Sequence, residues 1–210
     1  TQVKPGDHVV MHWRKGPGIE AAPPRYQWGD KTVGGGWVTT FNDHAVVSEN
    51  RLTPIDKDIP FEIAALMGCA VTTALGMINN EAKLKIGESV AVAGCGGVGL
   101  NVIQAAVLVG GNPIVAIDLH DRKLMLAFDT GATHLINAAD DDLKMEVKRF
   151  TGGQGVDVFV DCTGNVAVIS AGYDLIKPAG GRMILFEVFE RGAMPRAWPC
   201  APAPQWCDTS

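Results

Sequence analysis

The feature that most constrains the fold is a glycine-rich turn between an apolar strand and an amphipathic helix. Gly94, Gly96 and Gly99 form the pattern G-x-G-x-x-G directly after the apolar run Ser89–Ala93. A turn of this kind between a strand and a helix is typical of a dinucleotide-binding unit. The first glycine permits the tight turn, the second lets the backbone approach a pyrophosphate, and the third lets the helix pack closely on the strand. The helix N-terminus offers free N–H groups and a partial positive charge to the phosphates.

An acidic residue at the end of the next strand extends this motif. Asp118 ends the run Ile114–Asp118, 19 residues after Gly99, where such units carry the acid that binds ribose hydroxyls. Its charge would repel a 2′-phosphate, so the sequence favours NAD(H) over NADP(H). The alternative is that the glycines only form a turn and that Asp118 caps the helix 122–129. We predict cofactor contacts from Gly94, Cys95, Gly96, Gly97, Val98, Gly99 and Asp118.

A second candidate loop follows the strand Val156–Asp161. Loops at the carboxyl ends of parallel strands line the cofactor crevice. Cys162 and Thr163 could therefore contact the cofactor through their backbone or through the threonine hydroxyl. From the spacing alone, a plain turn is nearly as good an interpretation.

Strands and helices alternate from residue 89 onward. The strands are continuous apolar runs, which is typical of strands covered on both faces. This alternation predicts an α/β fold with a Rossmann-type, doubly wound parallel sheet. The expected strands are Ser89–Ala93, Ile114–Asp118, His134–Ile136, Val156–Asp161 and Arg182–Phe186, and the expected helices are Val98–Val109, Arg122–Asp129, Leu143–Phe150 and Val166–Ile176.

The residues before and after this region have a different character. Residues 1–60 are irregular and β-rich, with short strands expected at His8–Met11, Ala45–Ser48 and Arg51–Ile55. Helical stretches follow at 61–67 and 70–79, on either side of Gly68-Cys69. The segment 190–210 is rich in proline, which removes backbone donors, and we expect it to be disordered. We predict three parts: 1–60, 61–189 and 190–210.

Composition excludes several classes of protein. The net charge is −5 and no basic run occurs, which argues against binding to nucleic acid or to an anionic membrane. No run approaches the roughly 18 apolar residues of a membrane span. Five widely spaced cysteines make a poor disulfide framework, so we expect a cytoplasmic protein with free thiols.

Taken together, these segments resemble the zinc-type medium-chain alcohol dehydrogenases. The resemblance rests on Lys4–Val9, Ala64–Ala74 and Ala93–Leu100, and it continues through Gly131-Ala132-Thr133 and Ala179-Gly180-Gly181. It covers about residues 3–186. It implies a Rossmann domain joined to part of a β-rich, GroES-like catalytic domain, with NAD and a catalytic zinc as cofactors.

The resemblance also implies roles for single residues. Cys69 matches the last protein ligand of the catalytic zinc, and Thr73 matches the residue packed against the nicotinamide. Asp118 and Lys123 match ribose contacts. A thiolate suits Zn²⁺, which would polarise the substrate oxygen. On its chemistry alone, Cys69 could equally be a small buried residue.

The sequence departs from the family pattern in three places. In the family, the other zinc ligands lie upstream of the turn Pro5-Gly6-Asp7, near which this sequence starts. The structural-zinc lobe is replaced by residues 11–29, which contain no cysteine. Glu187 stands where the family has small residues near the nicotinamide carboxamide. Because a catalytic zinc needs three protein ligands, we expect this polypeptide to be impaired.

Two functions remain open. The first is an NAD-dependent, zinc-assisted alcohol or polyol dehydrogenase that takes a small alcohol or carbonyl substrate and forms a homo-oligomer. The second is a non-catalytic NAD-binding Rossmann protein. Metal analysis discriminates between them, since zinc supports the first and its absence with retained NADH binding supports the second.

Overall fold

The computed structural model describes residues 2–186, which form two compact units. The first runs to Ala74 and the second begins at Leu75. Each unit is described by itself. The predicted boundary at 60/61 falls before the helix α1 (Phe61–Met67), whereas the units divide within α2 (Ala70–Gly76). The three-part division stays a prediction, and the segment 190–210 lies outside the described residues.

A five-stranded parallel sheet forms the centre of the second unit. Its strands are β5 (Val90–Ala93), β6 (Ile114–Asp118), β7 (His134–Asn137), β8 (Val158–Asp161) and β9 (Arg182–Leu185). The order across the sheet is β7-β6-β5-β8-β9. The strand order therefore reverses at β5, which places a crevice between the loops after β5 and β8. The predicted parallel sheet is confirmed.

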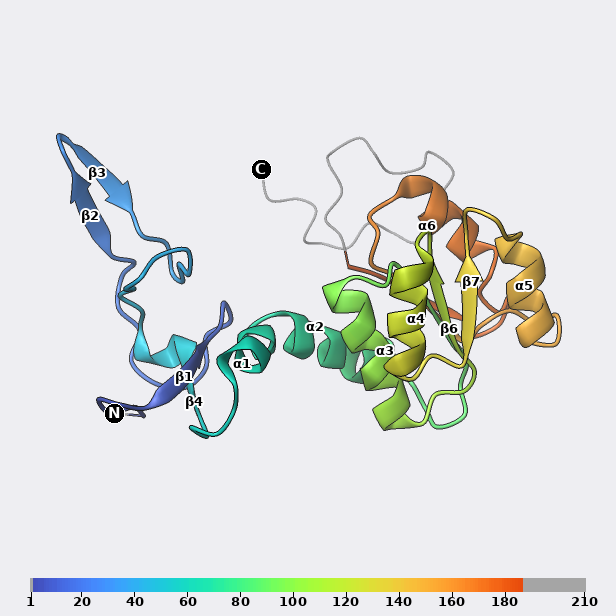
Figure 1. The fold of residues 1–210 in the computed structure, drawn as a ribbon, viewed down its shortest axis with the longest axis horizontal. Coiled ribbons are helices and arrows are strands. Elements are labelled where there is room, and N and C mark those ends of the chain that lie inside the picture. The colour runs from blue at the N-terminus through green and yellow to red at the C-terminus, as the bar shows by residue number, and fades with distance from the viewer. Residues whose placement is uncertain (1, 187–210) are drawn as a thin grey trace. The chain divides into compact units, whose positions relative to one another are not determined.

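Helices cover both faces of this sheet (Figure 1). They are α3 (Gly97–Val109), α4 (Asp121–Asp129), α5 (Leu143–Phe150) and α6 (Val166–Tyr173). One face packs Ala91, Ala93 and Phe159 with Val147 of α5. On the other face, Val92 of β5 lies next to Gly99 of α3. The sheet is doubly wound, as predicted.

The core follows from the apolar strand runs. All residues of β5, β6 and β8 are buried, whereas the edge strand β9 is only half-buried. Phe159 is fully buried and is the largest such side chain. This packing holds the carboxyl ends of β5, β6 and β8 in a fixed position, and the candidate site lies at these ends.

The first unit has little core. It contains β1 (His8–Met11) paired with β4 (Leu52–Ile55), the hairpin β2 (Arg25–Trp28) and β3 (Lys31–Gly34), and the short 3-10 helix η1 (Glu49–Arg51). Among its described residues, the buried apolar side chains are Val10, Ala64 and Ala74.

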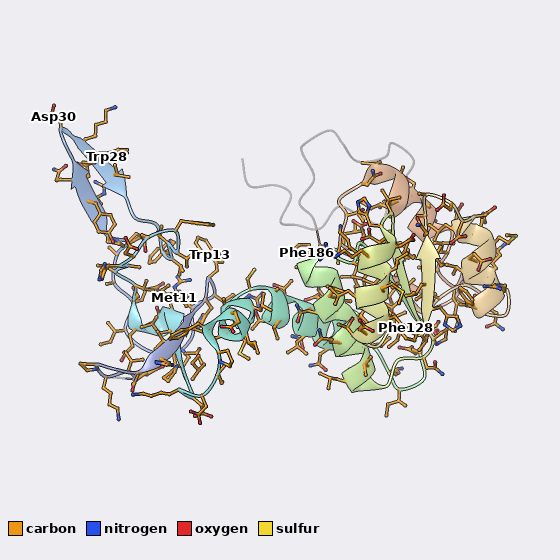
Figure 2. The ribbon with its side chains drawn as sticks, in the orientation of Figure 1. Met11, Trp13, Trp28, Asp30, Phe128 and Phe186 are labelled. Carbon is orange, nitrogen blue, oxygen red and sulfur yellow. The ribbon has the colours of Figure 1, made fainter. Side chains whose placement is uncertain are left out.

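Sequence reasoning was wrong in two places here. Ala45–Ser48 is not a strand. Its β-branched residues favour a strand, but no partner strand pairs with it among the described residues. The hairpin β2–β3 was missed because residues 11–29 were interpreted as an irregular lobe. Its signal was a two-residue Gly29-Asp30 turn between short strand-like runs, and Figure 2 labels Trp28 and Asp30 near its tip.

The predicted helices around Cys69 are confirmed with one refinement. After α2 the chain continues as a π-helix, η2 (Met77–Glu81). No single helix among the described residues has the length and apolar character of a membrane span, although the bent pair Phe61–Met67 and Ala70–Glu81 meets those criteria when the two are combined.

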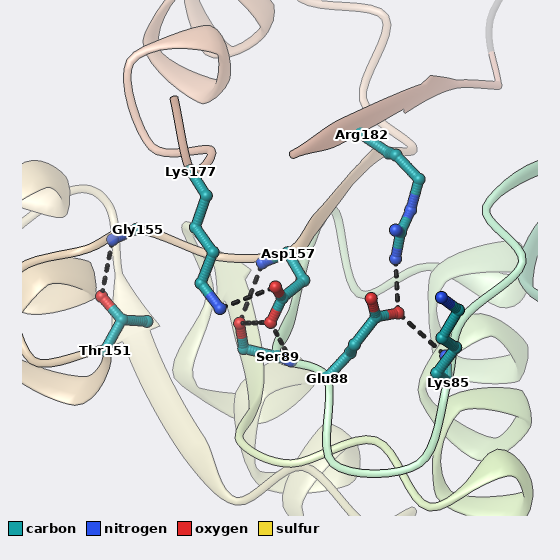
Figure 3. Close-up of polar contacts among 8 residues, drawn as sticks. All are labelled: Lys85, Glu88, Ser89, Thr151, Gly155, Asp157, Lys177 and Arg182. Carbon is teal, nitrogen blue, oxygen red and sulfur yellow. Dashed lines mark hydrogen bonds and ion pairs between the residues drawn. The ribbon is translucent and has the colours of Figure 1, made fainter. Parts of the chain in front are cut away.

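Half-buried ion pairs lie at the amino ends of β5, β8 and β9 (Figure 3). The Asp157 carboxylate accepts hydrogen bonds from the N–H of Ser89 at 2.8 Å and from its hydroxyl at 2.7 Å, and lies 2.6 Å from the Lys177 ammonium. Arg182 pairs with Glu88 beside it. Although partial burial opposes it, Lys177 and Ser89 hold the pKa of the Asp157 carboxyl below its usual 3.8. This network fastens β5, β8 and β9 together at the edge opposite the glycine loop.

Candidate functional site

The glycine loop after β5 has the geometry that the sequence predicts for it. Gly94 has a φ of +90°, which favours glycine, and an added Cβ would lie 3.0 Å from Cγ2 of Thr163. Gly99 lies so close to the backbone that an added Cβ would collide with the carbonyl oxygen of Gly94. Gly94 therefore makes the turn and Gly99 brings α3 against β5, as predicted.

The middle of the loop is open. A Cβ added at Gly96 or Gly97 would meet nothing within 4 Å. Gly96 is the N-cap of α3 and makes no side-chain cap. The N–H groups of the first turn of a helix have no partner within the helix, so those of Gly97 and Val98 are available to donate to an anion.

Asp118 connects the glycine loop to the end of β6. Its side chain is buried, and its Oδ2 accepts the N–H of Cys95 at 2.8 Å. Oδ1 accepts the N–H groups of Leu119 and His120 at 2.8 and 3.1 Å. The Lys123 ammonium lies 3.7 Å from Oδ2.

The alternative role for Asp118, a cap of the following helix, is not what the structure shows. The N-cap of α4 is His120, which makes no side-chain cap. The Asp118 carboxylate instead holds the turn before α4 and the glycine loop together. Lone pairs not used by these amides remain for ribose hydroxyls.

Cys95 turns its side chain away from the opening. Its thiol is buried, and Sγ lies 3.7 Å from the carbonyl oxygen of Ile117. Burial, reinforced by the Asp118 charge, raises the pKa of the Cys95 thiol to about 12. The thiol is therefore neutral and inert, and the backbone N–H of Cys95 is taken by Asp118.

The loop after β8 forms the second wall of the crevice. The Thr163 hydroxyl donates to Oδ1 of Asp161 at 2.7 Å and accepts the N–H of Asn165 at 3.0 Å. Cys162 donates its backbone N–H to the carbonyl of Ala93 at 2.8 Å. The structure thus brings Cys162 and Thr163 next to the glycine loop, but the hydroxyl of Thr163 points to Asp161.

Sequence reasoning missed Asp161 itself. It is fully buried at the end of β8, and its carboxylate bonds both Thr163 and the N–H of Gly164. The signal was available, because Asp161 is followed by Cys162-Thr163-Gly164-Asn165, and an Asp ahead of such turn residues often bonds the backbone two residues on.

Cys69 and Thr73 belong to the first unit. Cys69 is exposed, so the interpretation of it as a small buried residue is wrong. Its carbonyl accepts the N–H of Thr73 at 2.9 Å, which joins α1 to α2. Among residues 2–186, no group of three or more His, Cys, Asp or Glu side chains could hold a metal ion. These described residues therefore do not fit a catalytic zinc.

A cavity lies elsewhere in the second unit. It holds about 250 Å³ and is lined by Lys144, Lys148, Gln154 and residues 174–176, among others. None of the predicted site residues lines it. The segments 153–155 and 174–178 precede β8 and β9, so this cavity lies at the amino ends of the strands.

Comparisons with known proteins agree with the glycine-loop fold. A family model described as zinc-binding dehydrogenase matches residues 97–197. The S-(hydroxymethyl)glutathione dehydrogenase of Paracoccus denitrificans is 35% identical over 161 residues, which is 74% of this chain and 43% of that protein. The chain spans about two fifths of the length of the curated relatives that it matches.

Solved structures give the same result. Alcohol dehydrogenase TADH from Thermus sp. ATN1 is 31% identical to this chain, with a TM-score of 0.64. The match covers 71% of this chain and 43% of that chain. Benzyl alcohol dehydrogenase from Acinetobacter calcoaceticus is 23% identical to this chain, with a TM-score of 0.74. The match covers 92% of this chain and 59% of that chain, and at this identity it shows only that the fold is shared. The doubly wound sheet, its glycine loop and these matches together show that the chain belongs to the zinc-type medium-chain alcohol dehydrogenase family.

Proposed function

We propose that the chain carries the NAD(H)-binding part of a dehydrogenase that interconverts a small alcohol and a carbonyl compound. The observation that supports this best is the hydrogen bond between Asp118 and Cys95, because it joins the acid at the end of β6 to the glycine loop after β5. A bound NAD would accept a hydride from the alcohol. We further propose a cytoplasmic protein that forms a homo-oligomer and binds neither nucleic acid nor membrane.

Each part of the site has a distinct task in this proposal. The N–H groups of Gly97 and Val98, at the start of α3, bind the pyrophosphate. Asp118 accepts the ribose hydroxyls, and Lys123 beside it partly compensates the carboxylate charge. Thr73 would pack against the nicotinamide, as the family resemblance implies. Cys69 would be a zinc ligand only together with ligands from outside the described residues.

Direct titration tests the proposal. Quenching of protein fluorescence by NADH and by NADPH gives the two dissociation constants. We expect tighter binding of NADH, because the Asp118 carboxylate disfavours a 2′-phosphate. Equal affinity for both cofactors, or no binding of either, would contradict the proposal.

A second candidate is a non-catalytic NAD-binding protein. The observation that favours it is that the described residues form no group of three or more His, Cys, Asp or Glu side chains, around Cys69 or elsewhere, that could hold a metal ion. NADH binding without zinc and without turnover of simple alcohols would support this candidate over the dehydrogenase.

A further inference from the structure

Asp161 is a fully buried carboxylate whose hydrogen bonds all go to the loop that follows it. Oδ1 accepts the Thr163 hydroxyl at 2.7 Å and the Thr163 N–H at 3.3 Å, while Oδ2 accepts the N–H of Gly164 at 3.0 Å. Burying a charge is costly unless it is hydrogen-bonded in this way. The loop conformation and the buried carboxylate therefore depend on each other.

The same bonds continue into α6. The Thr163 hydroxyl, having donated to Asp161, accepts the N–H of Asn165 at 3.0 Å. Asn165 in turn caps α6, since its Oδ1 accepts the N–H groups of Ala167 and Val168. Asp161 thus fixes the loop at one end and the capped helix fixes it at the other.

The loop that Asp161 holds lies directly against the glycine loop. A Cβ on Gly94 would be 3.0 Å from Cγ2 of Thr163 and 3.1 Å from the carbonyl oxygen of Cys162. Ala93, the last residue of β5, pairs with Asp161 in register. A shift of the loop by a fraction of an ångström would therefore change the width of the crevice at Gly94.

The two sides of β5 carry two matched carboxylates. Asp118 lies on the β6 side and Asp161 on the β8 side, and each bonds backbone N–H groups at the carboxyl end of its strand. A dinucleotide crosses the sheet at this reversal of strand order. With the adenosine ribose on Asp118, the second nucleotide half must extend over β8.

We infer that Asp161 is a positioning residue that holds the loop 162–165 in the shape required by the nicotinamide half of the dinucleotide. It acts through Thr163 and Gly164 and does not touch the cofactor. The inference rests on the proposed function. It predicts an effect on NADH binding that is absent from the binding of AMP, which occupies only the β6 side.

The test is a pair of titrations, with NADH by fluorescence and with AMP by NMR, on the wild type and on Asp161→Asn. The amide of Asn turns an N–H toward Gly164 or Thr163, which are themselves donors, so the loop must shift. We expect NADH to bind about tenfold more weakly, the loss expected for one hydrogen bond to a charged group. AMP affinity should be unchanged.

Two controls separate positioning from general destabilisation. Asp157→Asn alters a carboxylate four residues earlier, at the opposite edge of the sheet, and should lower the melting temperature without changing NADH affinity. Thr163→Ser keeps the hydroxyl that bonds Asp161 and Thr163→Val removes it, so the Val variant should bind NADH more weakly than the Ser variant.

Each result bears on a different claim. A folded Asp161→Asn variant with wild-type affinity for NADH, or with equal losses for NADH and AMP, would overturn the inference. If Asp161→Asn does not fold, the Thr163 pair decides, and equal NADH affinity of the Ser and Val variants overturns it. Failure of the wild type to bind either nucleotide would instead reject the proposed function.

Discussion

The backbone N–H of Cys95 donates a hydrogen bond of 2.8 Å to the carboxylate of Asp118, so the turn after β5 is fastened to the end of β6. In the sequence, these residues belong to two separate parts of one motif, the glycine pattern and the distant acid. The fold makes them a single unit. A change at Asp118 should therefore affect both the choice of cofactor and the stability of the loop.

Replacing Asp118 separates these two effects. Asp118→Ala should reduce the preference for NADH over NADPH, because the charge that repels a 2′-phosphate is gone. It should also weaken the binding of both cofactors, since the N–H of Cys95 loses its acceptor. Asp118→Asn keeps a hydrogen-bond acceptor but removes the charge. It should therefore also lose the preference for NADH, but its affinity for the cofactors should fall less than that of Asp118→Ala. The measurement is a titration of each variant with both cofactors.

The matched control is Asp129→Ala, at the exposed end of α4. It removes one negative charge without touching the glycine loop, so its preference for NADH should equal that of the wild type. A wild-type preference in Asp118→Ala would show that the acid does not select the cofactor.

Gly96 and Gly99 should respond differently to substitution. Gly96 has a φ of −86° and open space around it, so Gly96→Val should fold with a change in stability of about 0.5 kcal/mol or less. Its side chain should nevertheless occupy the approach of the pyrophosphate and abolish NADH binding. Thermal unfolding and NADH titration measure the two effects. Retained affinity would mean that the loop is only a turn.

In contrast to Gly96→Val, the substitution Gly99→Ala should destabilise the folded protein. Its Cβ would collide with the carbonyl of Gly94, and relieving that contact must move α3 away from β5. Overpacking of this kind typically costs about 1 to 3 kcal/mol. We expect a lowered melting temperature or insoluble protein, and a normal melting temperature would contradict the close packing described above.

Much of the nucleotide-binding part could be predicted because its signals are local. The helix Leu143–Phe150 was predicted with its exact bounds, and Asp142 caps it as an acid in the first turn should. The strands β5 and β8 were predicted one and two residues too long at their starts, at Ser89 and at Val156-Asp157. Of those extra residues, Ser89 and Asp157 bond each other through their side chains, and Val156 forms an isolated bridge with Ile176.

The candidate site was less predictable because its carboxylates accept hydrogen bonds from nearby backbone N–H groups. No spacing rule reveals that the Cys95 thiol turns inward. The exposure of Cys69 also depends on how α1 meets α2, which a short apolar run does not specify. The hairpin β2–β3 was missed for a different reason, since its residues are all exposed and show no apolar face.

Acid should destabilise the second unit through Asp157. The pKa of its carboxyl is lower in the folded chain than the ordinary 3.8, so the ionised form contributes stability at pH values above 3.8. This contribution is lost as the pH falls through the folded-state pKa. Asp157→Asn should lower the free energy of unfolding by about 1 to 3 kcal/mol at neutral pH and flatten its dependence on pH below about 4.

Urea unfolding of the wild type and of Asp157→Asn, measured at neutral pH and at about pH 3, checks this. The difference in the free energy of unfolding between the wild type and Asp157→Asn should be smaller at the lower pH. The control is Asp174→Asn, which removes an exposed ion pair with Lys144 at 3.3 Å. Because an exposed pair contributes little to stability, this variant should leave the free energy of unfolding nearly unchanged at both pH values. A constant difference across pH would contradict the role of the ionised Asp157.

The last prediction concerns zinc. A catalytic zinc needs three protein ligands and an open fourth position, and the described residues, which include the exposed Cys69, form no group of three ligands that could hold a metal ion. Without a Lewis acid, the pKa of an alcohol hydroxyl stays far above neutral pH. The purified polypeptide of residues 1–210 should therefore contain far less than one zinc per chain after dialysis. Its NADH production from simple alcohols should match a blank without protein.

Elemental analysis of the wild type and of Cys69→Ser decides this prediction. Equal and substoichiometric zinc in both is the expected result, while NADH binding should persist because the glycine loop and Asp118 do not depend on Cys69. Stoichiometric zinc that disappears in Cys69→Ser, together with turnover of an alcohol, would show the prediction wrong. Cys69 would then share the metal with ligands beyond residues 2–186, and the dehydrogenase would be favoured over the non-catalytic binding protein.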